Sequence, residues 1–204
     1  ASPVVAGGIA NLLAYQESVS TELFRAKLIN NTGTHIDLFE TLIAPDPDPV
    51  LSYVSHTIVD TCETCDNDGR ADAGETIEIW FTVKNYGGFA DSVTVSLDFA
   101  EFEDTTTATI LDTTGYIGDV SAYAQLNNQT SPVKIHINEG VAHARDLRFV
   151  VHFSSDYHLS ESTITLTVEN GIEVSGITTT DQIWTADQMY IINNSFRVGT
   201  GTTL

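Results

Sequence analysis

The chain has 204 residues, of which 28 are acidic and 8 are basic, and its formal net charge at pH 7 is −20. So negative a surface repels nucleic acid and anionic membranes, and neither is an expected partner. Only 18% of the residues are charged, and Thr, Ser, Val, Ile and Gly abound, which is typical of an exported β protein. We therefore expect an extracellular or cell-surface protein that does not insert into a membrane.

The first fifteen residues carry no charge. Their apolar run is too short and too broken by Gly to cross a bilayer, so a protein surface must bury it. The C-terminal segment 195–204 also has a strand pattern without a polar finish. Both ends are therefore expected to dock on a partner, through Val4, Val5, Ile9, Leu12 and Leu13 at one end and Phe196 and Val198 at the other.

A helical pattern comes next, within residues 20–39. Its apolar and aliphatic positions recur at helical spacing, Ser20 or Thr21 can cap its first turn, and the polar run 30–33 ends it. The Pro-rich, acidic stretch "PDPDPV" (45–50) is a stiff linker, because each Pro fixes its own backbone and extends the residue before it. The sequence thus predicts an N-terminal extension over 1–44 and a linker over 45–50.

The chain then changes to the alternation of half-buried strands, as in "TIEIWFTVKNY" and "DSVTVSLDF". Between them "GGFA" predicts a hairpin or a sharp turn between strands. Eight to ten such segments occur in all, at a spacing typical of an antiparallel sandwich. The expected fold class is mainly β, an antiparallel Ig-like or jelly-roll-type β-sandwich over 51–180 with a short apolar N-terminal extension. Residues 181–204 are expected to add C-terminal strands that dock on a neighbour.

Two sets of aromatic residues have different expected roles. The first clusters around strands and is expected in the core: Trp80, Phe81, Tyr86, Phe89 and Phe99. The second could instead form an exposed platform for carbohydrate: Tyr116, Tyr123, Trp184 and Tyr190.

The only cysteines, Cys62 and Cys65, lie in the acidic stretch "DTCETCDNDG". Zinc would need two further ligands, of which His56 is the one candidate, and an acidic loop disfavours a redox thiolate. We expect a local disulfide, which implies an oxidising exterior. Three Asn-x-Ser/Thr triplets, at Asn30, Asn128 and Asn193, are candidate glycosylation sites.

The next residues concentrate carboxylates in a loop that predicts a cation site. Packed this closely, the carboxylates repel one another unless a cation or solvent screens them. Ca²⁺ accepts six to eight oxygen ligands in flexible geometry, and two glycines allow the backbone to turn around it. The alternative is a solvated acidic turn. The expected calcium ligands are Asp66, Asp68, Asp72 and Glu75, with the backbone carbonyl of Arg70.

The opening "ASPVVAGGIANLL" resembles the segment that comes after the nucleophile in subtilisin-like serine proteases. The resemblance covers about the first forty residues and includes "ELFRAKLINNTG". It implies a buried helix, but the family's nucleophile would lie two residues before Ala1 and its Asp and His motifs far upstream. The six histidines lie in strand-like or loop stretches and are expected to be surface or core residues. We therefore expect no catalytic triad in this chain. The matching positions are Ala1, Ser2, Pro3, Val5, Ala6 and Gly7.

Residues 53–99 resemble the Ig-like β-sandwich modules appended to secreted prokaryotic proteases and adhesins. That resemblance implies an accessory role in spacing, adhesion, stabilisation or assembly. The matching positions are Asp68, Gly69, Asp72, Gly74, Glu75, Val83, Asn85 and Gly87.

These features are compatible with three functions from different classes. The first is a noncatalytic, calcium-stabilised structural subunit that assembles head-to-tail through its termini into a homo-oligomer, filament or surface layer. The second is the accessory part of a secreted subtilisin-like protease, and the third is a carbohydrate or cell-surface binding module. A helix folded against its own domain would favour the second, and ordered ends on a neighbour the first.

Overall fold

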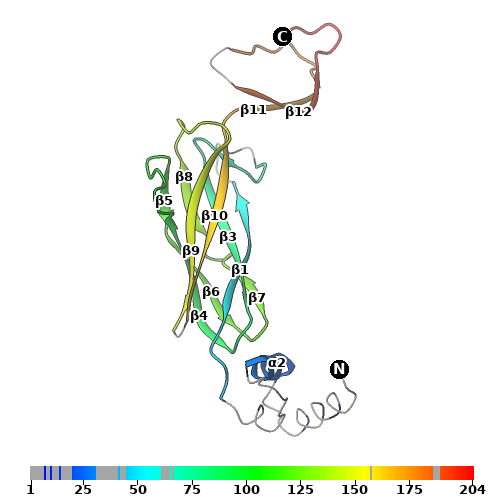
Figure 1. Cartoon of the computed structure of the whole chain (residues 1–204). Coiled ribbons are helices and arrows are strands. Elements are labelled where there is room, and N and C mark those ends of the chain that lie inside the picture. The colour runs from blue at the N-terminus through cyan, green and yellow to red at the C-terminus, as the bar shows by residue number, and fades with distance from the viewer. Residues whose placement is uncertain are drawn as a thin grey trace.

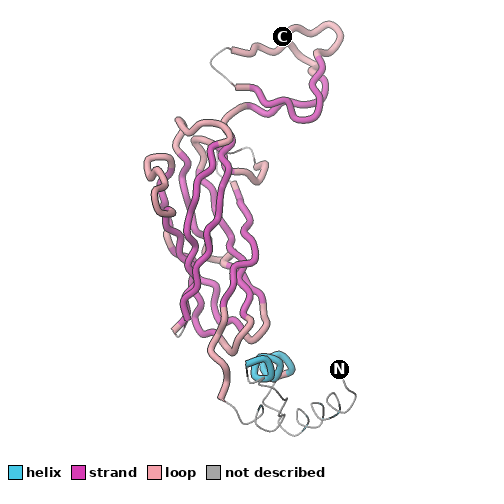
Figure 2. The backbone as a smooth tube through the Cα atoms, in the orientation of Figure 1, coloured by secondary structure: helices cyan, strands magenta, loops and turns pink. Residues whose placement is uncertain are grey.

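The structure, a computed structural model (Figure 1), describes residues 7, 10, 14, 20–30, 41, 45–60, 65, 67–156, 158–185 and 189–204. Within this part the protein is mainly β, as predicted, and its elements lie in a row along one axis. The helix lies at one end, the long strands in the middle, and a small pair of strands at the other end (Figure 2).

The N-terminal helical pattern is a helix, α2 (Thr21–Asn30). The side-chain oxygen of Ser20 accepts a hydrogen bond from the backbone N–H of Leu23 at 3.1 Å, which is the expected N-cap. Glu22 in the first turn and Lys27 in the last complement the helix dipole. No helix of the described residues is long and apolar enough to cross a membrane.

Ten strands of the described part make two sheets, here called the sandwich. The first sheet has the order β1-β3-β8-β5, with β7 also paired to β3, and the second has the order β2-β10-β9-β4-β6. Pairing is antiparallel except between β2 and β10. The strands are β1 (Leu51–Val59), β2 (Ala71–Asp72), β3 (Thr76–Asn85), β4 (Ala90–Phe99), β5 (Ala108–Asp112), β6 (Thr114–Val120), β7 (Gln125–Asn127), β8 (Val133–Ile137), β9 (Arg145–Ser155) and β10 (His158–Glu169).

Alternate residues of both sheets form one hydrophobic core. Phe81 of β3 and Phe149 and Phe153 of β9 are fully buried, as the period-2 pattern requires. The prediction that Tyr86 and Phe89 belong to the core is wrong, because these residues are 46% and 53% exposed. They lie in the turn between β3 and β4, beyond the ends of the strands.

That turn carries the chain from one sheet to the other, so "GGFA" is a sharp turn and not a hairpin. The buried amide of Asn85 organises it: Oδ1 accepts from the N–H groups of Val50 (3.1 Å) and Gly87 (3.0 Å). Nδ2 donates to the carbonyl oxygens of Gly88 and Val120. The linker therefore packs directly on the turn, where a Cβ added to Gly88 would clash with the carbonyl oxygen of Pro47.

The last two strands form a separate pair, here called the C-terminal unit. β11 (Ile172–Ile177) and β12 (Tyr190–Arg197) pair in parallel, with Ile172 opposite Tyr190 and Ile177 opposite Arg197. Figure 1 shows them beyond the end of the sandwich opposite α2. The sandwich was expected to cover residues 51–180, but this range includes β11, which pairs with β12 and not with the sandwich strands. The segments "QMYII" and "FRVGT", expected as two strands, both contribute to β12.

Candidate functional site

The acidic loop connects β1 to β3 at the end of the sandwich nearest the C-terminal unit. Its base is closed by the β1–β3 ladder, in which Val59 lies opposite Glu78. Gly69 and Gly74 have φ angles of 80° and 91°, a left-handed conformation that glycine adopts without strain. The two glycines therefore turn the backbone within the loop, as the sequence predicts.

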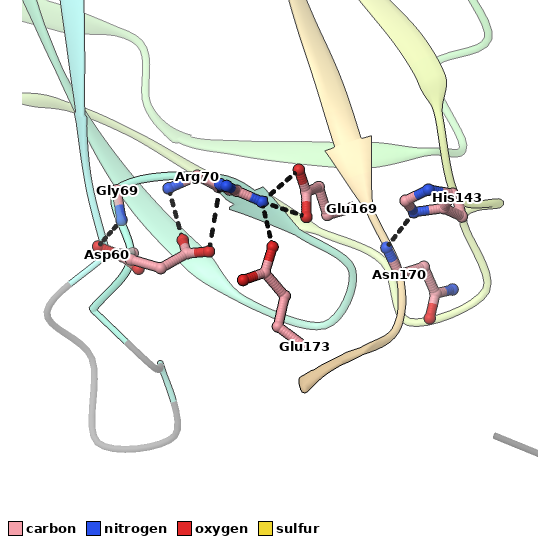
Figure 3. A network of polar contacts seen from close by, with 8 residues as sticks. Asp60, Gly69, Arg70, His143, Glu169, Asn170 and Glu173 are labelled. Atoms are coloured by element: carbon pink, nitrogen blue, oxygen red, sulfur yellow. Dashed lines mark hydrogen bonds and ion pairs between the residues drawn. The ribbon is translucent and has the colours of Figure 1, made fainter. Parts of the chain in front are cut away.

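Asp60 begins this loop and is 3% exposed. Its Oδ1 accepts a hydrogen bond from the N–H of Gly69 at 3.2 Å (Figure 3). The acidic motif in the sequence does not include Asp60, because this residue stands six residues before the acidic run and comes directly after a strand. Its position directly after the strand β1 was the available signal.

Arg70 is the centre of an ion-pair network on the outer side of the loop (Figure 3). Its Nη1 lies 2.8 Å from both carboxylate oxygens of Glu169 and also contacts Glu173. Its Nε lies 3.4 Å from Asp68 Oδ2. The hydrogen bond to Glu169, followed by the charges of Glu169, Glu173 and Asp68, raises the pKa of Arg70, so the guanidinium stays charged at every physiological pH.

This network joins three parts of the chain that are far apart in sequence. Asp68 belongs to the acidic loop, Glu169 ends β10, and Glu173 lies in β11. The Arg70 side chain is 40% exposed, so solvent screens these pairs and their net contribution to stability is modest. Their main effect is geometric, since they fix the loop against the start of the C-terminal unit.

The neighbouring Asn170 reinforces the same junction. Its backbone N–H donates to Nδ1 of His143 at 3.3 Å (Figure 3), and its side-chain amide donates to the carbonyl oxygen of Val141 at 2.6 Å. The residue at which the chain leaves the sandwich is therefore held from two sides.

The predicted calcium ligands do not all gather at one point. Among the described residues, one group of acidic side chains has oxygens within 4.8 Å of one another, and it consists of Asp68, Glu169 and Glu173. The Arg70 guanidinium already lies among these three. Asp72 and Glu75 stand outside this group, although Asp72 Oδ2 and Glu75 Oε2 are buried atoms. Asp66 lies outside the described residues. Glu169 and Glu173 come about a hundred residues after Asp68, so no local motif could reveal them.

Cys65 is disulfide-bonded, and its sulfur lies 3.8 Å from the carbonyl oxygen of Thr76 at the start of β3. Its predicted partner, Cys62, lies outside the described residues, so the Cys62–Cys65 pairing stays a prediction.

The predicted docking residues at the C-terminus lie in the C-terminal unit. The Phe196 ring packs on Trp184, with centroids 5.0 Å apart, and Trp184 stacks on Tyr190 at 4.3 Å with an interplanar angle of 7°. Val198 is 42% exposed. Several other large apolar side chains of the unit are also exposed: Ile172, Ile177, Ile183, Met189, Ile192 and Leu204. The N-terminal docking residues, Val4, Val5, Ile9, Leu12 and Leu13, lie outside the described residues.

The four residues considered for a carbohydrate platform do not share one contact surface. Trp184 and Tyr190 stack on each other in the C-terminal unit. Tyr123 instead packs edge-on against Tyr86, with centroids 6.1 Å apart, and carries the guanidinium of Arg25 at 4.6 Å from its centroid. Tyr116 is half exposed on β6.

Four of the described histidines take part in hydrogen bonds or ion pairs. Nδ1 of His56 lies 2.7 Å from the Tyr53 hydroxyl, and burial lowers the pKa of this histidine. Nδ1 of His136 lies 3.1 Å from the Thr76 hydroxyl. His152 lies within 4.0 Å of Asp98 and Glu161, while His143 holds Asn170. Each contact joins the histidine to another group of the sandwich or its loops, and the noncatalytic role expected for the histidines stays a prediction.

The sequon residue Asn128 is fully buried. Its Oδ1 accepts from the N–H of Phe81 at 2.6 Å, and its Nδ2 donates to the carbonyl oxygens of Ile79 and Ser131. A glycan on this nitrogen would break these bonds, so this sequon is a core element of the fold.

Comparison with known proteins identifies no family. No family model matches the chain, and no curated protein matches it. Among solved structures, one described as "AvmM Catalyzes Macrocyclization in Alchivemycin A Biosynthesis" is 10% identical, with a TM-score of 0.31 over 56% of this chain and 88% of that one. The structure of BslA, a bacterial hydrophobin, is 12% identical, with a TM-score of 0.27 over 58% of this chain and 98% of that one. Likenesses this weak carry no argument about function.

Proposed function

We propose that the chain is a noncatalytic structural module of a secreted protein, in which an Ig-like sandwich acts as a spacer. One observation carries this proposal: the chain enters the sandwich at one end and leaves it at the other. The linker 45–50 leads from the helical side into β1, and β10 runs to the opposite end, where it continues into β11 (Figure 1). A domain threaded in this way keeps its N-terminal and C-terminal neighbours apart by its own length.

The contacts of α2 favour an accessory part of a larger secreted protein over a subunit that offers its N-terminal helix to a neighbour. Phe24 is 2% exposed, and Arg25 stacks on Tyr123 of the same chain. Lys27 pairs with Asp46 of the linker at 2.8 Å. The helix is thus held by its own sandwich and linker, which is the arrangement expected beside a subtilisin-like domain.

Light scattering and small-angle X-ray scattering of the 204-residue chain, over a range of protein concentrations, test this proposal. We expect a monomer whose radius of gyration clearly exceeds the roughly 17 Å of a compact chain of this length. A compact monomer would contradict the spacer role.

Head-to-tail assembly remains the second candidate, and the exposed aliphatic residues of the C-terminal unit favour it. A free strand edge with apolar side chains is a template for a further strand. If the same scattering experiment shows particles that grow with concentration, and Ile192→Lys abolishes the growth while Thr165→Lys on the outer face of β10 does not, assembly through β12 replaces the spacer role.

A further inference from the structure

The chain passes from the sandwich to the C-terminal unit through Asn170 and Gly171, the one Asn-Gly pair in its sequence. The pair lies between the end of β10 at Glu169 and the start of β11 at Ile172. Asn-Gly pairs are chemically labile, because glycine has no side chain to keep its backbone nitrogen away from the side-chain carbonyl carbon of the asparagine. The covalent structure of this junction can therefore change with time.

Hydrogen bonds hold the side-chain amide of Asn170 in the folded state. Its Nδ2 donates to the backbone carbonyl oxygen of Val141 at 2.6 Å and to that of Glu139 at 3.4 Å. The backbone N–H of the same residue donates to Nδ1 of His143 (Figure 3). These bonds oppose deamidation, since Nδ2 is the atom that leaves in that reaction.

The backbone nitrogen of Gly171 is less constrained. Its N–H donates to none of the described acceptors, whereas the next N–H, that of Ile172, donates to the carbonyl oxygen of Met189 at 2.8 Å. A pocket of about 620 Å³ lies beside the Asn-Gly pair and is also lined by Glu139 and His143. Water, which the reaction consumes, therefore reaches the pair.

The C-terminal unit should open more readily than the sandwich. β11 and β12 contribute no residue to the hydrophobic core of the described part of the chain, and a strand pair without a core is marginally stable. Local opening of such a unit costs little free energy. When it opens, the bond from Ile172 to Met189 breaks, and Asn170 is no longer held in place by the strand that follows it.

We propose that Asn170 is a site of spontaneous deamidation, which becomes reactive when the C-terminal unit opens. The backbone nitrogen of Gly171 loses its proton and forms a bond to Cγ of Asn170. The Cγ–Nδ2 bond breaks, Nδ2 takes up a proton and leaves as ammonia, and a succinimide ring remains. Water then adds to one of the two ring carbonyl carbons and yields either aspartate or isoaspartate at position 170. This site goes beyond the spacer role and does not depend on it.

Deamidation would weaken the junction permanently. The new carboxylate has no N–H to donate to the carbonyl oxygens of Val141 and Glu139. It also adds a negative charge close to those of Glu169 and Glu173. Isoaspartate lengthens the backbone by a methylene group, which displaces β11 relative to β10. The connection between the sandwich and the C-terminal unit would thus loosen as the protein ages.

The test is peptide mapping by mass spectrometry after the whole folded chain has been incubated at mildly alkaline pH. We expect residue 170 to become a mixture of aspartate and isoaspartate at least about ten times faster than residue 138 is converted. Asn138 is a suitable reference, because its side chain also donates to a backbone carbonyl oxygen, that of Thr106 at 2.6 Å, but it precedes Glu139. If position 170 remains asparagine in the folded chain and is converted only in urea, the folded junction protects the pair and the proposal is overturned.

Arg70→Gln tests whether opening of the C-terminal unit controls the reaction, because Arg70 pairs with both Glu169 and Glu173. This variant should speed the conversion of Asn170 by a factor of at least about three. Lys134→Gln is the matched control, since it removes a similarly exposed ion pair within the first sheet, to Glu78 at 2.9 Å. It should leave the rate unchanged. Equal rates in the two variants would overturn the proposal that opening exposes the site.

Asn170→Asp reproduces one of the two products and tests the effect on the junction. Hydrogen exchange of the β11 amides should be faster in this variant by a factor of at least about five, while the amides of β9 keep their protection. Unchanged exchange of β11 would overturn the predicted loosening of the connection.

Discussion

Single buried polar residues hold this fold at its turns. Asn85 ties together the linker, the β3–β4 turn and the end of β6, and Asn128 ties β3 to the β7–β8 connection. Each satisfies backbone groups of more than one segment. Asparagine is not a typical catalytic residue. In the sequence, Asn85 stood out only as part of an Asn-x-Gly phrase, and Asn128 only as part of a glycosylation triplet.

Replacing Asn85 with Ala should lower the free energy of unfolding by about 2–4 kcal/mol, because buried donors and acceptors of the linker and turn lose their partner. Urea denaturation measures this change. Asn127→Ala is the control, since Asn127 is exposed and accepts one local hydrogen bond, from Gln129. Its effect should stay within about 0.5 kcal/mol. Equal effects of the two variants would refute the role given to Asn85.

Glu103 should make the stability depend on acid pH. Its side chain is fully buried. Burial alone raises its pKa, but hydrogen bonds from the backbone N–H groups of Arg148 and Asp104 and from the Arg148 side chain, together with the charge of Arg145, outweigh burial, so its pKa is lowered from 4.5. The unfolded chain therefore takes up the proton first as pH falls. The stabilisation is complete above pH 4.5 and is lost as pH falls toward the folded-state pKa.

Glu103→Gln should cost about 2 kcal/mol at about pH 7 and flatten the loss of stability at acid pH. Unfolding curves at several pH values from neutral to strongly acidic measure both effects. The exposed neighbour Glu101 provides the control, because Glu101→Gln should leave the acid slope unchanged. A variant at Glu103 that keeps the full slope would show that other carboxylates cause it.

At the scale of elements, alternation in the sequence predicted the long strands well. β3, β4 and β9 bury alternate side chains over most of their length, and β10 does so in its second half. This periodicity needs no long-range information. Which strands pair with one another was harder to predict from the sequence. The turn between β3 and β4 leads from one sheet to the other with the linker packed against it, and local sequence does not report that contact.

The same limit applies to the candidate site. The density of acidic residues and two glycines marked the loop from sequence. However, Asp60 comes from a strand end, and Glu169 and Glu173 come from strands about a hundred residues away. Their contribution depends on how β10 passes the loop. Tyr86 and Phe89 were misplaced for a similar reason, since composition does not distinguish a strand interior from the turn at its end.

Gly88→Ala should test the packing of the linker on the β3–β4 turn. The added Cβ would clash with the carbonyl oxygen of Pro47, so linker or turn must move, at a cost of about 1–3 kcal/mol. Gly140→Ala is the matched control, because no heavy atom of the described residues lies within 4 Å of its added Cβ. Chemical denaturation should give a clearly lower midpoint for Gly88→Ala than for Gly140→Ala. Similar midpoints would mean that the linker does not pack on the turn in solution.

At the scale of the whole molecule, the hydrophobic core belongs to the sandwich alone. No residue of β11 or β12 belongs to the core cluster of the described residues. A pair of strands without a core is marginally stable by itself. The Arg70 network and the Asn170 contacts thus hold a weakly structured unit against a strongly structured one.

Hydrogen exchange of the whole chain should show this division directly. Amides of β9, which pairs with both β10 and β4, should exchange only on global unfolding. Amides of β11 and β12 should exchange faster by at least a factor of about 100, through local opening. Uniform protection across both parts would instead indicate one cooperative unit.

The threading of the chain through the sandwich has a mechanical consequence. β1 begins at the end near α2, and β10 finishes at the opposite end, beside the acidic loop (Figure 1). A pull on the two ends of the molecule therefore acts along these strands and shears their ladders. The β1–β3 and β9–β10 hydrogen bonds then share the load at once and do not open one after another. Such a module resists tension between whatever is attached to its two ends, and its lifetime under load is set by its unfolding rate.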